Sequence, residues 1–338
     1  MTTQPSPRLE QDQRRQEIFS LLKRSQSYIA LVAIFILASV ISVKNGRNLF
    51  LSVPNMMNVL RAVSENGIIA IGMTMIILLG DIDLSVGSVL GLVSTGSAAL
   101  MVKNGLGFVP AVLIALAIGA LYGLFNGTVV TRMKIQAFIV TLASMNIARG
   151  LARFWSGGIG IPLAYGDGPG YAPPMYEFFV YRVGDIVPMP AIILLVLFII
   201  FWILLNKTRF GRQLYAVGGN PTAAHLSGIN VKRIKTIAFM LCSVLAAIAG
   251  LIHSAQISQG GPNEGIGYEL NAVAAVAIGG TSMSGGKGSV FGTMIGALIL
   301  GMLDNMLGLN GVNSNLQLVI KGLLIIVAVF AQAVRKED

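Results

Sequence analysis

Two carboxylates two residues apart are the most informative charged residues of the sequence. The stretch Gly80-Asp81-Ile82-Asp83-Leu84-Ser85 places Asp81 and Asp83 between two apolar runs. Carboxylates are costly where they face lipid, so these two must face water, a polar cavity or a hydrogen-bonded helix terminus. One interpretation is a helix break beside a solute path, where Ser85 or the carboxylates contact hydroxyl groups. The other is a short cytoplasmic turn in which Asp83 caps the next helix.

Two asparagines inside apolar runs extend the set of candidate path-lining residues. Asn126 and Asn146 could reach a hydrated path, and asparagine in a helix bundle also serves as a hydrogen-bonding contact between helices. The predicted substrate-path residues are therefore Asp81, Asp83, Ser85, Asn126 and Asn146.

Other reactive side chains form no catalytic or metal-binding pattern. His225 and His253 are too isolated for a metal site, and Cys242 is a single cysteine within an apolar stretch. Neither His-Glu-x-x-His nor Gly-x-Ser-x-Gly occurs, so no protease or esterase nucleophile or metal is visible. We predict that the chain is not an enzyme and binds no metal or cofactor.

A glycine-rich segment, residues 277–289, invites a phosphate-loop interpretation that its spacing does not support. The first glycine of that motif falls at Thr281, and Gly288 stands where Ser or Thr should follow Lys287. An irregular re-entrant or broken-helix segment is more natural, because such backbone survives at membrane depth only against protein or water.

A short helix is predicted between Asn220 and Gly228. Asn220 can cap it, Pro221 fits its first position, and Gly228 can end it. A helix of about two turns is marginal alone and needs a packing partner. That partner is either a groove on a cytoplasmic motor subunit or the surface of this protein itself.

Composition sets the class of protein. The 338 residues are 54% hydrophobic and only 11% charged, with a mean hydropathy of +0.76. A soluble domain has about a quarter of its residues charged, and the 40 glycines suit closely packed helices in lipid. The net charge of +10 does not indicate nucleic-acid binding, because the basic residues lie between apolar runs.

The apolar runs predict an all-α, polytopic membrane helix bundle of about ten transmembrane helices. A polar cytoplasmic tail, 1–26, precedes a single membrane domain, 27–334. The predicted spans are 27–43, 66–80, 84–102, 109–130, 135–152, 189–206, 236–256, 270–285, 288–305 and 316–334.

Charge predicts the orientation. Residues 207–235 contain six basic residues and no acidic residue, which places this loop in the cytoplasm. The long segment 153–188 is then external, and ten spans leave both termini cytoplasmic. The segment 44–65 contains Lys44, Arg47 and Arg61 although this count makes it external.

We expect 44–65 to form a helix at the outer interface, with Met56, Met57, Leu60 and Val63 facing lipid. A second expectation is an internal two-fold repeat, since Gly87-Ser88-Val89-Leu90-Gly91 recurs as Gly288-Ser289-Val290-Phe291-Gly292. Repeated halves are common in transporters.

Over residues 50–330 the sequence resembles the permeases of bacterial ABC importers for monosaccharides, of the ribose, arabinose and inositol type. The resemblance rests on Ile71-Gly72-Met73-Thr74 leading into Asp81-Ile82-Asp83-Leu84-Ser85-Val86-Gly87, on Lys207-Thr208-Arg209-Phe210-Gly211 followed by Gly218-Gly219-Asn220 and Ala223-Ala224, and on Gly279-Gly280-Thr281 through Gly285-Gly286. Many members have a second glycine where this chain has Asp81.

The resemblance implies the partners and the mechanism. It implies a second permease copy or related chain, a cytoplasmic ABC ATPase that binds ATP and Mg²⁺, and a periplasmic sugar-binding protein contacting outer loops such as 153–188 and 257–269. It also implies alternating access for a sugar or polyol across the inner membrane. Residues expected to couple to the ATPase are Arg212, Asn220, Pro221, Ala224, His225, Ser227 and Gly228.

An ion-coupled secondary transporter of small polar solutes is the alternative. Ionisable residues within or beside spans would favour it, namely Asp81, Asp83, Asp304 and Lys321. A docking loop for a motor subunit would argue against it.

Overall fold

The computed structural model describes residues 27–44 and 46–334, so the predicted tail 1–26 lies outside the described residues. The helices are Ser27–Ile41, α2 (Val53–Leu78), α3 (Val86–Ala98) with a π-helical turn η1 (Ala99–Lys103), α4 (Phe108–Met133), α5 (Ala137–Ser156), α6 (Met189–Lys207), α7 (Arg209–Gly219), α8 (Pro221–Leu226), α9 (Val231–Gln256), α10 (Tyr268–Ile278), α11 (Val290–Leu309) and α12 (Ser314–Val334), with a 3₁₀ segment η2 (Pro174–Phe179). Three antiparallel strand pairs join β1 (Val43–Lys44) to β2 (Arg47–Asn48), β3 (Ile161–Pro162) to β6 (Gln259–Gly260), and β4 (Arg182–Val183) to β5 (Val187–Pro188).

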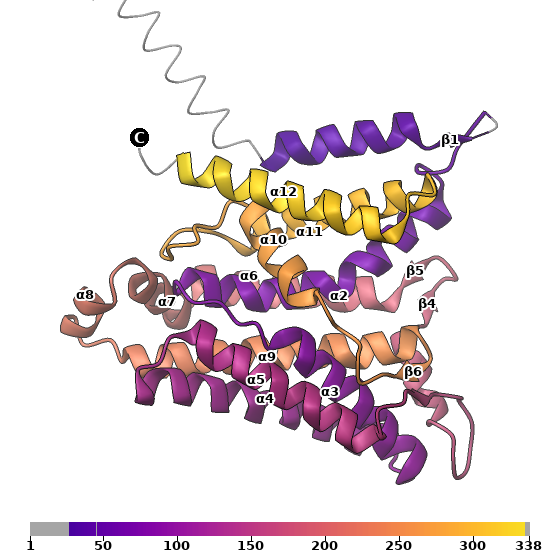
Figure 1. Cartoon of the computed structure of the whole chain (residues 1–338), viewed down its shortest axis with the longest axis horizontal. Helices are drawn as coiled ribbons and strands as arrows, with labels where there is room; N and C mark the ends of the chain where they lie inside the picture. The colour runs from indigo at the N-terminus through magenta and orange to yellow at the C-terminus, as the bar shows by residue number, and fades with distance from the viewer. Residues whose placement is uncertain (1–26, 45, 335–338) are drawn as a thin grey trace, which may run out of the picture.

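The long helices lie side by side, which gives the bundle two distinct ends (Figure 1). One end carries α7 and α8 and is called the α8 end; the other carries the strand pairs and is called the strand end. Six helices among the described residues are long and apolar enough to cross a membrane, and the shorter helices Ser27–Ile41, Tyr268–Ile278 and Ser314–Val327 are apolar. The mostly helical fold with these apolar helices agrees with the predicted membrane bundle, whereas the number of ten spans stays a prediction.

Helix α9 lies at the centre of the bundle and packs against α2, α3 and α4. Its contact with α4 is close because Gly119, Gly123 and Gly127 recur every fourth residue on the facing side of α4. A Cβ on Gly123 would overlap the carbonyl oxygen of Phe239. Small residues at such spacing bring helix backbones together in lipid, where packing replaces the hydrophobic effect as the source of association.

The interfacial helix expected over 44–65 is wrong. Helix α2 begins at Val53 and continues without interruption to Leu78, and Val63 is 2% exposed rather than facing lipid. The prediction placed a boundary within this helix because residues 64–66 are polar. Their burial has a simple cause: the Glu65 carboxylate is paired inside the protein with His253 and Tyr268.

The span predicted over 270–285 also differs from the structure. Helix α10 contains only Tyr268–Ile278, and residues 279–289 are irregular, as the glycine-rich sequence predicts. On its other side, the segment 260–267, which consists mainly of turns, runs from the strand end into the bundle beside α3 (Figure 1). A Cβ on Gly87 or on Gly265 would overlap the carbonyl oxygen of the other residue. We call residues 260–267 the re-entrant segment, because they run from the strand end into the bundle; the outer position expected for 257–269 stays a prediction.

The two proposed repeat motifs occupy different positions in their helices. Gly87 and Ser88 lie inside α3, whereas Gly288 and Ser289 precede α11, and Ser289 is its N-cap. The two connections do share one feature, because each follows a helix end with a glycine at positive φ, Gly80 at +76° and Gly280 at +85°. The internal repeat stays a prediction.

Candidate functional site: a basic loop and two helix breaks

Residues 207–235, here called the basic loop, contain the short helix that the sequence predicts. The Asn220 side chain accepts a hydrogen bond from the Ala223 N–H at 3.0 Å, and Pro221 occupies the first turn. Gly228 follows the helix at φ +83°, a conformation that L-residues with a Cβ rarely adopt. Helix α8 is thus bounded by the residues expected to bound it, which confirms the local structural prediction.

Helix α8 projects from the bundle with most of its surface exposed (Figure 1). Ala224 is its anchor, at 5% exposure, whereas the predicted coupling residues Arg212, Asn220, Pro221, His225, Ser227 and Gly228 are all exposed. Leu226 was not among them, yet it is 82% exposed. Leu226 is thus a large apolar side chain on the exposed face of a short helix, within a loop of basic residues.

Helix α7 lies between α8 and the two irregular segments that interrupt the helices of the bundle. We call residues 79–85, between α2 and α3, the first break and residues 279–289, between α10 and α11, the second break. A Cβ on Gly218 would overlap the Leu78 carbonyl oxygen, which itself accepts a hydrogen bond from the Gly286 N–H at 2.9 Å. The Tyr215 hydroxyl donates to the Gly288 carbonyl at 2.9 Å. Helix α7 therefore contacts the backbone at the end of α2, directly before the first break, and the backbone of the second break.

An ion pair makes the second connection between the basic loop and the first break. Lys235 Nζ lies 2.7 Å from Asp81 Oδ2, and both side chains are less than one-fifth exposed. Sequence reasoning placed Asp81 in a solute path and did not pair it with Lys235, which is 154 residues away. The structure places Asp81 at the junction of α2, α3 and α9.

Asp83, Ser85 and Asn126 form a buried hydrogen-bonded triad. Asp83 Oδ1 accepts from the Ser85 N–H at 2.9 Å and from the Ser85 hydroxyl at 2.6 Å, and Asn126 Nδ2 donates to Ser85 Oγ at 2.9 Å. All three have no exposed surface, and burial raises the pKa of the Asp83 carboxyl to about 6. In this conformation none of the three faces a path outside the chain.

Asp83 makes its hydrogen bonds within the first break. The Asp83 carboxylate binds the N–H of Ser85, the residue before α3, and no side chain caps the first turn of α3 itself. Asn146, the fifth predicted path residue, lies apart on the exposed side of α5 and donates to the Leu142 carbonyl of its own helix. The structure therefore brings together three of the five residues.

A buried ionic cluster near the strand end was missed by sequence reasoning. His253 Nδ1 lies 2.8 Å from Glu65 Oε2, and its Nε2 lies 2.9 Å from Glu264 Oε2. The Tyr268 hydroxyl donates to the same Glu65 oxygen at 2.8 Å. The cluster joins α2, α9, α10 and the re-entrant segment. The only signal in the sequence was the presence of ionisable residues within apolar runs, which in a membrane protein need partners. Within 27–44 and 46–334, no group of three His, Cys, Asp or Glu residues is placed to hold a metal ion.

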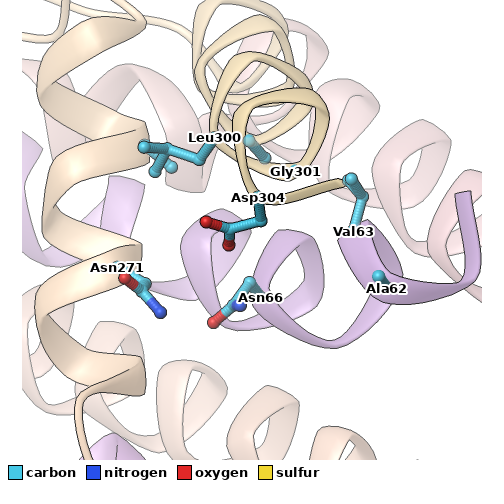
Figure 2. A pocket seen from close by; sticks show the side chains of 9 residues that line it. Ala62, Val63, Asn66, Asn271, Leu300, Gly301 and Asp304 are labelled. Carbon is cyan, nitrogen blue, oxygen red and sulfur yellow. The ribbon is translucent and has the colours of Figure 1, made fainter. Parts of the chain in front are cut away.

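A small cavity with three polar side chains lies between α2, α10 and α11. Figure 2 shows Asp304, Asn66 and Asn271 around it, and the Asp304 carboxylate also forms an ion pair with Lys321 at 2.8 Å. Its volume is about 40 Å³. That is enough for a few water molecules, whereas pockets for small organic ligands occupy roughly 300–1,000 Å³. This cavity cannot hold a sugar.

The apolar helices and these contacts define a multi-pass membrane protein in which the exposed helix α8 is linked through α7 and Lys235 to two breaks among its helices. The chain belongs to a family of permeases whose description is "branched-chain amino acid transport system / permease component", which matches residues 55–329.

Curated relatives of the chain are named as ribose or xylose permeases. The chain is 42% identical over 316 residues to the ribose import permease protein RbsC of Haemophilus influenzae, covering 93% of this chain and 94% of the relative. It is 42% identical to RbsC of Escherichia coli K12, covering 89% and 91%. Identity to the xylose transport system permease protein XylH of Haemophilus influenzae is 35%, covering 92% and 97%. No solved structure matches the chain.

Proposed function

We propose that this chain is the membrane permease subunit of an ATP-binding-cassette importer that moves a monosaccharide or polyol across the inner membrane by alternating access. The observation that carries the proposal is helix α8, which exposes Leu226 and is linked through α7 and Lys235 to both breaks. The 42% identity to ribose import permeases, over about nine-tenths of the chain, supports a sugar over an amino acid.

In the proposed mechanism, the ATPase acts on the permease by moving the basic loop. A cytoplasmic ATPase subunit binds ATP and Mg²⁺ and contacts α8, so the α8 end and both termini are cytoplasmic. When the ATPase closes, α8 and α7 move together, because a two-turn helix capped at both ends moves as a rigid unit. The packing of Gly218 on Leu78 and the hydrogen bond from the Tyr215 hydroxyl to Gly288 then displace the two breaks and the helices attached to them.

The other proposed partners follow from the same arrangement. A periplasmic sugar-binding protein delivers the solute to the strand end, where the loop 153–188 is packed onto the bundle by fully buried Tyr176. A second permease copy supplies the other side of the solute path. No catalytic step takes place on this chain.

The alternative, an ion-coupled transporter, finds less support. Such a transporter needs ionisable groups in its spans that exchange an ion during transport. Asp81 is paired with Lys235 at 2.7 Å and Asp304 with Lys321 at 2.8 Å, and each pair bridges two structural elements. These contacts are those of structural ion pairs.

The test is purification of the tagged chain in mild detergent from cells that contain its partners. We expect an ATP-hydrolysing subunit in near-equal amount, and we expect Leu226→Asp to remove that subunit by placing a charge in the docking contact. The control is Ile159→Asp, which changes a 74%-exposed residue beyond the opposite end of α5. Recovery of the unchanged chain without an ATPase would refute the proposal.

A further inference from the structure

The re-entrant segment 260–267 crosses part of the membrane without helical structure. Helix α10 has 11 residues, which span about 16 Å, roughly half of a 30 Å hydrocarbon core. The remaining depth between the strand end and α10 is covered by the irregular, turn-containing backbone that follows β6. Gly260 packs against Ser94 and Ala98 near the far end of α3, and Gly265 against Gly87 near its start, so the segment descends along α3.

This segment is only partly covered by the rest of the chain. Gly260, Gly261 and Gly265 are buried against the bundle, but Asn263 is exposed and Ile266 is 67% exposed. Leu270, in the first turn of α10, is 57% exposed on the same stretch. Irregular backbone does not occur facing lipid, because its polar groups would lose their hydrogen bonds there. Water or protein must therefore cover this face.

Helix α5 adds charged and polar groups to the same face. Arg149 donates from Nη1 to the carbonyl oxygens of Pro262 and Glu264 at 2.8 and 2.6 Å, and Arg153 Nε donates to Asn263 Oδ1 at 3.0 Å. The exposed Asn146 lies one turn before Arg149. Arg149 is half-buried and Arg153 is exposed, and arginines are costly against lipid, so this side of α5 also requires a wet or protein-covered environment.

We propose that the re-entrant segment 260–267 and the adjoining side of α5 form a wall of the solute path, and that this wall binds a neutral, hydroxyl-rich solute. This deepens the proposed function and rests on it. The charges of the wall balance, since Arg149 and Arg153 stand with Glu264 and Glu269, and the amides of Asn146 and Asn263 offer donors and acceptors for hydroxyl groups. The cavity of about 40 Å³ between α2, α10 and α11 is too small for a sugar, so it does not compete with this wall as a solute site.

The single buried cysteine, Cys242, makes a direct test possible. In intact cells with the full transporter, a membrane-impermeant thiol reagent is applied to Ile266→Cys and to Leu121→Cys. The two positions are matched in exposure, at 67% and 65%, but Leu121 lies on the apolar outer side of α4. The unchanged chain, with Cys242 0% exposed, gives the baseline.

We expect Ile266→Cys to react at least about tenfold faster than Leu121→Cys, because thiolates form in water and are suppressed in apolar surroundings. Asn263→Cys is the second variant and should react as Ile266→Cys does. Equally slow reaction of Ile266→Cys and Leu121→Cys, with normal uptake, would overturn the proposal. Oxidative cross-linking of two Ile266→Cys chains without labelling would also overturn it, because the second copy would then cover this face. If Ile266→Cys is labelled fast but uptake does not need ATP, the wall proposal stands and the ABC mechanism is refuted.

Discussion

Lys235 Nζ lies 2.7 Å from Asp81 Oδ2, and this pair joins the first turn of α9 to the first break. The contact lies just beyond the docking helix α8 in the chain, so a displacement of the basic loop reaches α2 and α3 directly. Asp81 also stands where many permeases of the resembled family have glycine. In this chain the contact adds a charged link to the backbone packing of Gly218.

We expect Asp81 and Lys235 to behave as a coupled pair. Asp81→Asn and Lys235→Met should each lower thermal stability and uptake, because each leaves a mostly buried charge without its partner. The double variant should be no worse than the poorer single variant, with a coupling energy of about 1–3 kcal/mol. Thermal inactivation of the purified complex measures this, and strictly additive losses would show that the pair contributes nothing.

Adjacent glycines of α7 provide a matched test of the contact with the first break. Gly218→Ala should destabilise the protein by about 1–3 kcal/mol and reduce uptake, because the new Cβ overlaps the Leu78 carbonyl oxygen. Gly219→Ala meets no atom within 4 Å and should be neutral or slightly stabilising. Thermal unfolding in detergent compares the two, and equal effects would contradict the close packing of α7 on α2.

The end of helix α8 should be intolerant of proline. Gly228→Pro should abolish uptake while leaving membrane insertion intact, because proline cannot adopt φ +83° and removes the N–H that bonds the His225 carbonyl at 2.9 Å. Gly228→Asn should cause a smaller loss, since asparagine tolerates this region of φ. Uptake assays with surface-expression controls make the comparison, and normal uptake by Gly228→Pro would contradict the proposal that α8 couples to the ATPase.

The buried cluster at His253 should contribute strongly to stability. Glu65→Ala should destabilise the protein by about 3–5 kcal/mol, because His253 and Tyr268 both lose a buried partner at 2.8 Å. Glu65→Gln should cost less, since its amide oxygen still accepts a hydrogen bond. Glu177→Ala, at an exposed carboxylate, is the control in thermal unfolding. Comparable melting temperatures for Glu65→Ala and Glu177→Ala would contradict the cluster's role.

Local patterns predicted much of this molecule correctly. The residues that bound α8 were identified from cap chemistry alone, because Asn220, Pro221 and Gly228 act over a few residues. The apolar runs likewise located the membrane helices, and the glycine-rich spacing located the irregular second break.

What could not be predicted depends on contacts between residues far apart in the chain. Polar Glu65 divided α2 in the sequence because its partners, His253 and Tyr268, lie about 190 and 200 positions away. The pairing of Asp81 with Lys235 was hidden for the same reason. The re-entrant course of 260–267 required knowing that Gly265 meets Gly87, and no periodicity in either segment indicates that approach.

The most direct test of the central claim is transport by the purified complex in vesicles, with radiolabelled ribose as the probe and the binding protein present on the strand-end side. We predict that ribose accumulates only when ATP and Mg²⁺ are on the α8 side, and that Leu226→Asp abolishes this accumulation. Accumulation driven by a proton or sodium gradient without ATP, unaffected by Leu226→Asp, would contradict the account.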